Sequence, residues 1–493
     1  MINMKRANGV LLHISSLPSD YGIGSLGKEA YEFVDFLVES KQTYWQILPI
    51  GPTGYGDSPY SSFSTFAGNP YFVSLDILCE EGYLTKDEYI DICWQDVEDK
   101  VDYGLLYEKR FPLLQIAMRR FLSAESHDFN VFCEANDWLD DYAAFMTIKD
   151  VQGGKHWVKW PDALKLKDDN AVKEVILDNY DTYNFYRAIQ YHFFKQWHSL
   201  KEYTKCKGIE IIGDLPIYMA YDSVDVWAHR ELFELASDGN PVRVAGCPPD
   251  GFSATGQLWG NPLYRWDENY KQGFSWWLKR ITYLANVYDV VRIDHFRGFA
   301  SFYAINYGES DACNGMWCKG PGMDLFKLLP SDLKIIAEDL GFLSEDVFKL
   351  LEDSGYPGMK VLEFAFDTRE PSHVDYLPFN YPKHSIAYCG THDNSTIMGW
   401  LKAANSEDVK LAKEYMMAED ESDFNWVMMK TLMATSANVT ILQVQDLLGL
   451  DDSARMNTPA TSENNWVWRC KKGSLNHELA DKLAYYTKLY YRD

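Results

Sequence analysis

The sequence has 493 residues, which is enough for one α/β barrel of about 250 residues together with large insertions. Its 72 acidic residues outnumber 47 basic ones, for a formal net charge of −25, which argues against nucleic acid or a membrane surface as partner and favours a neutral or small substrate. The polar first eight residues do not resemble a signal peptide, no apolar run is long enough to span a membrane, and the nine scattered cysteines are typical of reduced thiols, so we expect a cytoplasmic protein.

Eight segments have the length and apolar character of buried parallel strands, and eight is the strand number of an α/β barrel. In chain order they are residues 10–13, 44–48, 209–213, 290–294, 334–338, 359–364, 385–390 and 439–442. Between the first two, Ala30, Phe33, Val34 and Leu37 follow the spacing of an amphipathic helix. Most later gaps also leave room for the crossover helix that parallel pairing requires. The sequence predicts one α/β domain over residues 1–493, a decorated (β/α)8 TIM barrel.

Two gaps between these strands are too long for a simple crossover. Residues 75–207 are rich in helical and charged segments, so we expect a helical insertion subdomain between the second and third strands. Residues 222–289 begin with a stretch rich in glycine and proline, and we expect a second insertion there, between the third and fourth strands. Residues 290–493 would then hold the remaining strands, from the fourth to the eighth.

An acidic residue follows three of the predicted strands directly: Asp294, Glu338 and, after Gly390-Thr391-His392, Asp393. The carboxyl ends of the strands form the face of a TIM barrel that carries its chemistry. A retaining glycosidase or transglycosylase needs two carboxyl groups about 5 to 5.5 Å apart, one to attack the anomeric carbon and one to protonate the leaving oxygen. We therefore predict that Asp294 is the nucleophile and Glu338 the acid/base.

The charge states of these acids can be anticipated from their neighbours. Arg292 lies two residues before Asp294 on the same strand face, and a nearby cation is expected to lower the pKa of that carboxyl. Glu338 needs a raised pKa if it is to donate a proton near neutrality. Each acid alone could instead cap the helix that follows its strand. Three acids behind three buried strands make this alternative the weaker one.

Sugar recognition fits the remaining polar and aromatic residues of these segments. Asp393 would hydrogen-bond sugar hydroxyls and help to distort the ring, while His295 and His392 would donate hydrogen bonds beside the developing charge. The 16 tryptophans and 33 tyrosines exceed the usual share of aromatic residues. Most will lie in the core, but flat aromatic faces also stack on the apolar faces of pyranose rings, which indicates a carbohydrate cleft.

Short segments along the whole chain carry a resemblance to a known family. They are LHISSLP (12–18), GYGDSPY (54–60), AGNP (67–70), GDLPIY (213–218), PPD (248–250), TGQ (255–257), WGNPLY (259–264), the three acidic segments, and RMNTP (455–459). This ordered set resembles glycoside hydrolase family 77, the 4-α-glucanotransferases of amylomaltase (disproportionating enzyme) type in the α-amylase clan. The resemblance implies the same roles for the three acids: Asp294 as nucleophile, Glu338 as acid/base and Asp393 as stabiliser of the transition state.

The resemblance also implies which residues surround the cleaved bond. They are Tyr60, Asp214, Arg292, His295 and His392. Residues 249–259 resemble the family's lid loop over the acceptor side, which adds Asp250, Gln257 and Trp259 as candidate substrate-binding residues. Glycines at 251, 256 and 260 would permit this loop to move, and Trp259 offers a stacking face. Gly251 and Ala254 depart from the family's usual sequence in this loop, so the acceptor preference of this protein can differ from that of the family.

The activity implied is transfer of a segment of an α-1,4-glucan to the 4-hydroxyl of glucose or of another glucan, through a covalent glucosyl-enzyme. The substrates would be maltooligosaccharides and longer α-1,4-glucans, with no metal and no organic cofactor, and we expect a monomer. An α-glucan hydrolase of the same clan is the nearest alternative. More remote alternatives are a metal-dependent barrel hydrolase that would use His13, His295 and His392, and a non-catalytic glucan-binding protein.

Overall fold

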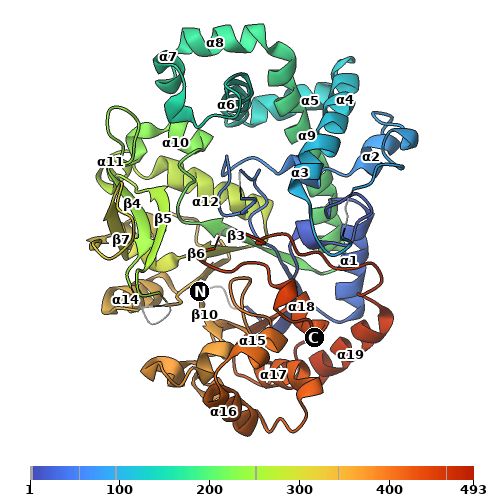
Figure 1. Cartoon of the computed structure of the whole chain (residues 1–493), viewed down its shortest axis with the longest axis vertical. Helices are drawn as coiled ribbons and strands as arrows, with labels where there is room; N and C mark the ends of the chain where they lie inside the picture. The colour runs from blue at the N-terminus through green and yellow to red at the C-terminus, as the bar shows by residue number, and fades with distance from the viewer. Residues whose placement is uncertain (1–3, 55, 95–96, 250–252, 342, 462) are drawn as a thin grey trace.

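Eight parallel strands form the central sheet of this computed structural model, which describes all residues except 1–3, 55, 95–96, 250–252, 342 and 462 (Figure 1). Their order in the sheet is β10-β11-β12-β1-β2-β3-β6-β9. Their bounds are β1 Ala7–Leu11, β2 Tyr44–Gln46, β3 Glu210–Pro216, β6 Val290–Asp294, β9 Ile335–Ala337, β10 Gly358–Val361, β11 Ser385–Tyr388 and β12 Val439–Gln443. The N–H group of Ala337 donates to the carbonyl oxygen of Pro357 at 3.0 Å, so the two outer strands meet and the barrel nearly closes. The predicted (β/α)8 barrel is confirmed.

The observed strand bounds differ from the predicted ones where the chain turns early or where a strand pairs further along its neighbour. β6 has the predicted bounds. β1 ends at Leu11, two residues before its predicted end, because the chain turns into the short 3-10 helix Ile14–Ser16. β3 runs three residues further than predicted, since Asp214 and Pro216 pair with Arg292 and Asp294 of β6. This extension brings Asp214 to the end of the barrel where the acids lie.

Helices cover the outside of the sheet, as the crossover rule requires (Figure 1). In α1, the four residues predicted to face the core are buried, and Phe36 is buried as well. The bounds outside residues 75–207 are α1 Lys28–Glu39, α10 Val224–Ala228, α11 Trp266–Lys271, α12 Ser275–Val287, α13 Met323–Phe326, α14 Glu345–Ser354, α15 Ile397–Ala403, α16 Ser406–Met416, α17 Phe424–Met433, α18 Val444–Leu447 and α19 His477–Leu489.

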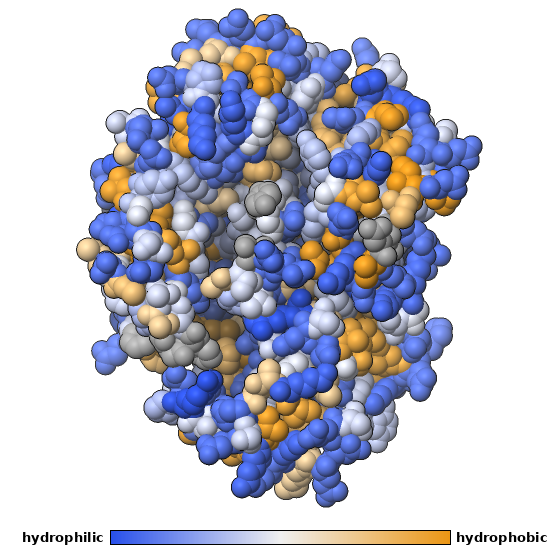
Figure 2. Space-filling model, viewed as in Figure 1, coloured by the Kyte–Doolittle hydropathy of each residue, from blue (hydrophilic) through white to orange (hydrophobic). Residues whose placement is uncertain are grey.

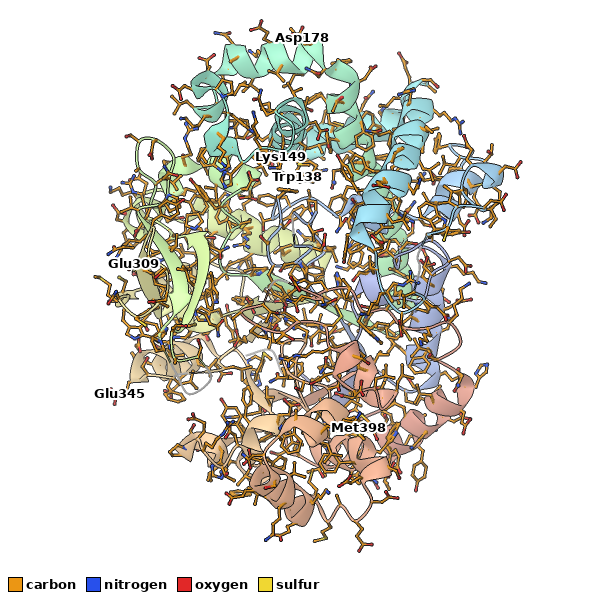
Figure 3. All side chains as sticks on the ribbon, viewed as in Figure 1. Trp138, Lys149, Asp178, Glu309, Glu345 and Met398 are labelled. Atoms are coloured by element: carbon orange, nitrogen blue, oxygen red, sulfur yellow. The ribbon has the colours of Figure 1, made fainter. Side chains whose placement is uncertain are left out.

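A layer of helices lies above the barrel in Figure 1 and comes from residues 75–207. Its helices are α2 Leu75–Glu80, α3 Tyr103–Leu105, α4 Phe111–Leu122, α5 His127–Ala135, α6 Leu139–Val151, α7 Asp162–Lys165, α8 Asp169–Asp178 and α9 Tyr180–Cys206. The long helix α9 packs against α4, α5 and α6 in this layer and against α1 of the barrel. Lys149 of α6 also reaches the barrel, because its Nζ lies 2.5 Å from Asp222 Oδ2 beyond β3 (Figure 3).

A second, antiparallel sheet was not predicted from the sequence. Its strand order is β5-β4-β7-β8, and its bounds are β4 Arg243–Cys247, β5 Gln257–Pro262, β7 Ser301–Asn306 and β8 Met316–Lys319. β4 and β5 come before β6 in the chain, and β7 and β8 come after it. β5 and β8 are largely exposed, so they lack the continuous apolar run that revealed the barrel strands. The lid loop expected over residues 249–259 ends earlier, because Gln257 to Trp259 form the start of β5. We call this sheet the lid sheet.

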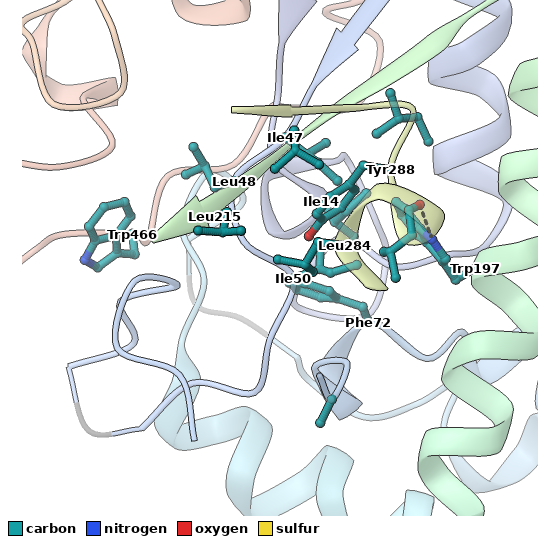
Figure 4. Packing of buried hydrophobic residues seen from close by; sticks show 14 of the residues in the cluster. Ile14, Ile47, Leu48, Ile50, Phe72, Trp197, Leu215, Leu284, Tyr288 and Trp466 are labelled. Carbon is teal, nitrogen blue, oxygen red and sulfur yellow. Dashed lines mark hydrogen bonds between the residues drawn. The ribbon is translucent and has the colours of Figure 1, made fainter. Parts of the chain in front are cut away.

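The main hydrophobic core lies between the barrel and its helices. Figure 4 shows part of it, where Ile47, Leu215 and Tyr288 pack together and the indole N–H of Trp197 donates to the carbonyl oxygen of Val287 at 3.1 Å. A smaller cluster fills the barrel interior, with residues such as Leu11, Ile212 and Ile386.

The face seen in Figure 2 is largely hydrophilic, as the charge of the chain leads one to expect. In the part of the chain that the structure describes, no helix has the length and apolarity needed to cross a bilayer.

The end of the barrel opposite the acids is held by a buried arginine. Arg492 is fully buried and donates to five backbone carbonyl oxygens at 2.8 to 3.3 Å; they belong to Ala7, Met433, Thr435, Ala437 and Asn438. These residues lie at or near the starts of β1 and β12, and Arg6 also donates to the carbonyl oxygens of Met433 and Thr435, at 2.8 Å each. The guanidinium of Arg492 therefore joins the first and last strands of the barrel.

We predict that Arg492→Met lowers the free energy of unfolding by about 3 kcal/mol, because five buried carbonyl oxygens lose a charged donor, which for the carbonyls of Ala7 and Ala437 leaves no other side-chain donor in the described residues. The urea concentration at the midpoint of unfolding measures this loss. Lys488→Met, at an exposed position of the neighbouring helix α19, is the control and should leave the midpoint in place. Equal midpoints for the two variants would contradict the prediction.

Candidate active site

One buried guanidinium gathers the acids at the carboxyl end of the barrel. The two terminal nitrogens of Arg292 lie 2.6 Å from Asp214 Oδ2, 3.1 Å from Asp294 Oδ1 and 3.9 Å from Glu338 Oε2. The arginine side chain is 5% exposed, whereas that of Asp294 is 28% exposed. Asp294 can therefore be reached from solvent while the cation behind it cannot.

Strand register explains why these side chains meet. β3 and β6 pair Asp214 with Arg292, and β6 and β9 pair Ile293 with Ala337. Asp294 and Glu338 each follow by one residue, so they stand side by side on neighbouring strands. Glu338 also donates its backbone N–H to the carbonyl oxygen of Ile293 at 3.1 Å, which fixes the two strand ends against each other.

Glu338 and His295 are held by a tight turn after β6. The carboxylate of Glu338 accepts the backbone N–H of His295 at 2.5 Å and that of Leu340 at 3.3 Å. His295 has a φ of 52° and a ψ of 47°, a left-handed conformation that few residues other than glycine adopt. This conformation aims the His295 N–H at the carboxylate, and the imidazole meets the edge of Trp259, with ring centroids 4.9 Å apart at 89°.

Tyr60, His392 and Asp393 form the opposite side of the cluster. The Tyr60 hydroxyl donates to Asp214 Oδ2 at 2.7 Å, and its ring lies nearly parallel to His392, with centroids 5.1 Å apart. His392 Nε2 is 3.4 Å from Asp393 Oδ1, and that oxygen also accepts the side-chain N–H of Asn457 at 2.7 Å. The hydrogen bond from Tyr60 joins this side of the cluster to Arg292 through Asp214.

Burial sets the charge states in the cluster. It raises the pKa of Glu338, as expected for a proton donor, although Arg292 and the His295 N–H work in the other direction. The expectation of a lowered pKa for Asp294 is wrong, because burial and the other carboxylates outweigh Arg292 and raise it. Burial also lowers the pKa of His295 to about 3 and lowers that of His392, so both imidazoles are neutral donors near neutral pH.

The lid sheet brings its own polar contact to the site. The indole N–H of Trp259 donates to the side-chain oxygen of Gln257 at 3.0 Å, and both residues belong to β5. Asp250 and Gly251, which were also considered from the sequence, lie outside the described residues. A cavity lies behind the cluster, between β3 and α12, where Leu284 and Arg280 line it.

Sequence reasoning missed several residues that contact the cluster, among them Asn457 and Trp466. Asn457 binds Asp393, and Trp466 lies 5.7 Å from the Tyr60 ring and 5.9 Å from that of His392, measured between centroids. A signal for Asn457 existed, because it lies in the RMNTP segment that contributed to the family resemblance. No comparable signal marked Trp466, one of 16 tryptophans.

The histidines of the metal alternative are engaged separately. Nδ1 of His13 accepts the backbone N–H of Leu48 at 3.3 Å, and the other two contact Trp259 and Tyr60, as described above. Among the described residues, no group of three or more His, Cys, Asp or Glu side chains is arranged to hold a metal ion. No disulfide joins the cysteines in that part of the chain.

Comparison with known proteins agrees with this geometry. A family model described as 4-alpha-glucanotransferase, of glycoside hydrolase family 77, matches residues 12–476. The chain belongs to the 4-alpha-glucanotransferase family. The resemblance noted in the sequence is thereby confirmed, and the family assignment favours a glycosyltransferase over the hydrolase alternative.

Members of the 4-alpha-glucanotransferase family match the chain along its whole length. The 4-alpha-glucanotransferase of Clostridium butyricum is 45% identical over 489 residues, which are 98% of this chain and 100% of that protein. That of Thermus thermophilus is 42% identical over 497 residues, with 98% of each chain covered. The structure of amylomaltase from Streptococcus agalactiae in complex with acarbose has a TM-score of 0.96 and 43% identity, covering 99% of this chain and 100% of that one.

A buried carboxyl supports the loop that carries Asp393. Asp446, just beyond β12, accepts the backbone N–H of Ile397 at 2.8 Å, four residues after Asp393. Burial raises the pKa of Asp446 from 3.8 to about 7. The unfolded chain loses this proton near pH 4, whereas the folded chain keeps it up to about pH 7. Asp446 therefore makes the folded state progressively less stable as the pH rises from 4 to 7.

We predict that Asp446→Asn, which can still accept from Ile397, gains stability relative to the parent as the pH rises from 4 to 7. The relative gain should be at most about 4 kcal/mol, as the size of the pKa shift implies. Urea unfolding at each pH measures it, with Asp178→Asn at an exposed end of α8 as the control (Figure 3). A difference between variant and parent that stays constant over this range would contradict the prediction.

Proposed function

We propose that this protein moves a segment of an α-1,4-glucan to the 4-hydroxyl of glucose or of another glucan, with retention of configuration. The observation that carries the proposal is the position of Asp294 and Glu338 beside each other at the barrel end, both within reach of Arg292. Membership of the 4-alpha-glucanotransferase family supports the choice of reaction.

In the first half of the reaction, a carboxylate oxygen of Asp294 attacks the anomeric carbon. The bond to the leaving 4-oxygen breaks as Glu338 protonates that oxygen, and a glucosyl ester of Asp294 with inverted configuration forms. The raised pKa of Glu338 favours the protonated form that donates this proton. The charge of Arg292 favours the ionised form of Asp294, which is the form that attacks.

In the second half, the 4-hydroxyl of an acceptor sugar takes the place of the leaving chain. Glu338, now a carboxylate, removes its proton as the oxygen attacks the anomeric carbon, and Asp294 is released. The second inversion restores the α configuration. Asp393, held by Asn457, accepts hydrogen bonds from sugar hydroxyls, while the neutral imidazoles of His295 and His392 donate to them.

Transfer wins over hydrolysis when a sugar rather than water meets the glucosyl ester. Trp259 stands at the edge of His295 on the lid sheet and offers an apolar surface that favours a sugar and excludes water. We propose that residues 222–289 act as an insertion with this lid and that residues 75–207 act as a helical insertion subdomain on the single barrel domain. We also propose a monomer in the cytoplasm, without metal or organic cofactor.

Incubation with maltotriose alone, in the presence of EDTA, tests the reaction. We expect glucose together with a ladder of maltooligosaccharides longer than the substrate, because transfer redistributes glucose units while conserving the number of bonds. Separation of the products by chain length measures this. Glucose and maltose with nothing longer would indicate a hydrolase, and loss of activity on addition of EDTA would favour the metal-dependent alternative.

Substitution of the two catalytic acids tests their roles. We expect Glu338→Gln to lower kcat by about 10²- to 10⁴-fold, because the leaving oxygen loses its proton donor. Asp294→Asn should lower it further, since no glucosyl ester can form. Glu345→Gln, at an exposed position on α14, is the matched control for Glu338→Gln (Figure 3). Full activity of Asp294→Asn together with normal glucan binding would contradict the proposed site.

A further inference from the structure

One guanidinium ties together the two loops that carry Asp393 and Asn457. Arg455, in the RMNTP segment, donates from Nη2 to the carbonyl oxygen of Asp393 at 2.5 Å and from Nη1 to the Ser395 hydroxyl at 3.3 Å. Its Nε donates to the carbonyl oxygen of Asn457 at 2.7 Å. All three nitrogens of a planar group are therefore engaged, and the loop after β11 is joined to the loop after β12.

The side chain of Asp393 depends on such support because less of the protein packs around it than around the other two acids. It is 46% exposed, against 28% for Asp294 and 13% for Glu338. Its Oδ1 accepts the side-chain N–H of Asn457 at 2.7 Å. The place of the carboxylate thus follows from its own main chain and from Asn457, and Arg455 binds the main chain of both.

The chain just before this arginine holds the far end of the loop after β11. Asp452 accepts the backbone N–H of Thr396 at 2.9 Å and the hydroxyl of Ser395 at 3.1 Å. Beyond the arginine, the backbone N–H of Asn457 donates to the carbonyl oxygen of His392 at 3.1 Å. Together with the contacts of the guanidinium, these hydrogen bonds follow the loop from one end to the other.

The fixed geometry of the guanidinium matters more here than the number of its hydrogen bonds. Arg455 is half-buried, so water can reach the same oxygens and bind them if the arginine is absent. Water does not hold two loops at a set separation, whereas the rigid fork of an arginine does. A displacement of about 1 Å in a group that acts on the substrate can cost about 10²-fold in rate.

We propose that Arg455 is a positioning residue for Asp393. It acts through the main chain of Asp393 and through Asn457, and it sets where the carboxylate meets the sugar ring as that ring distorts in the transition state. This inference rests on the proposed function, which gives Asp393 its contact with sugar hydroxyls.

The first test measures kcat and KM for maltotriose in Arg455→Met. We expect kcat to fall about 10- to 100-fold while KM changes little, because a displaced carboxylate loses mainly the contact that strengthens in the transition state. Arg119→Met, at an exposed position on α4, is the control and should keep both values. Arg455→Lys keeps the charge but cannot span both loops, so its kcat should lie between those of the parent and Arg455→Met.

A second comparison separates positioning from general support of the fold. In Asp393→Ala the carboxylate is gone, so the addition of Arg455→Met should lower the residual kcat by no more than about twofold, whereas independent effects would multiply. Long incubations with maltotriose and separation of the products measure this residual rate. Urea unfolding shows which variants are folded, and Arg455→Lys carries both comparisons if Arg455→Met is not.

Three outcomes would overturn the proposal: an unchanged kcat in Arg455→Met, full kcat in Arg455→Lys, or a fall in the Asp393→Ala background as large as in the parent. If the parent fails to convert maltotriose, the proposed function fails first. Crystal structures of the parent and of Arg455→Met then decide the positioning role. A shift of the Asp393 carboxylate by about 1 Å relative to Asp294 supports it, and an unchanged position rejects it.

Discussion

The active site depends on one buried cation among several acids. A guanidinium taken out of water is costly unless carboxylates and good geometry offset the loss of hydration. Arg292 is surrounded by Asp214, Asp294 and Glu338, and these acids in turn cannot all ionise around a single positive charge. Burial raises the pKa of Glu338 in spite of this cation, and a raised pKa is the condition that a general acid requires.

The barrel supplies the geometry for this balance of charge. β3, β6 and β9 are neighbours in the sheet, and their register brings Asp214, Arg292 and the two catalytic acids to one edge. Segments remote in sequence then close the site: Tyr60 comes from the loop after β2, and Asn457 from the loop after β12. The strands place the charges, and these loops orient the groups that would bind sugar hydroxyls.

The sequence revealed the parts of the structure that leave a local pattern. Continuous apolar runs marked all eight barrel strands, and an acid directly behind such a run marked Asp294 and Glu338. The lid sheet left no such pattern, because its short strands depend on partners from both sides of β6. Trp466 was missed since its contacts with Tyr60 and His392 join residues far apart in the chain. The pKa of Asp294 is raised, whereas the sequence predicted that it would be lowered. Burial outweighs the charge of Arg292, and burial cannot be read from the spacing of residues alone.

The composition of the lid sheet has a consequence for how the molecule folds. β4 pairs with β7, and the loop that this pairing closes contains α11, α12 and the whole of β6. The entropy of closing such a loop is offset only after the intervening segments have condensed. The lid sheet is therefore complete only when β6, the strand that carries Asp294, lies within the closed loop, whereas closing the barrel joins Ala7 to Val439 across nearly the whole chain.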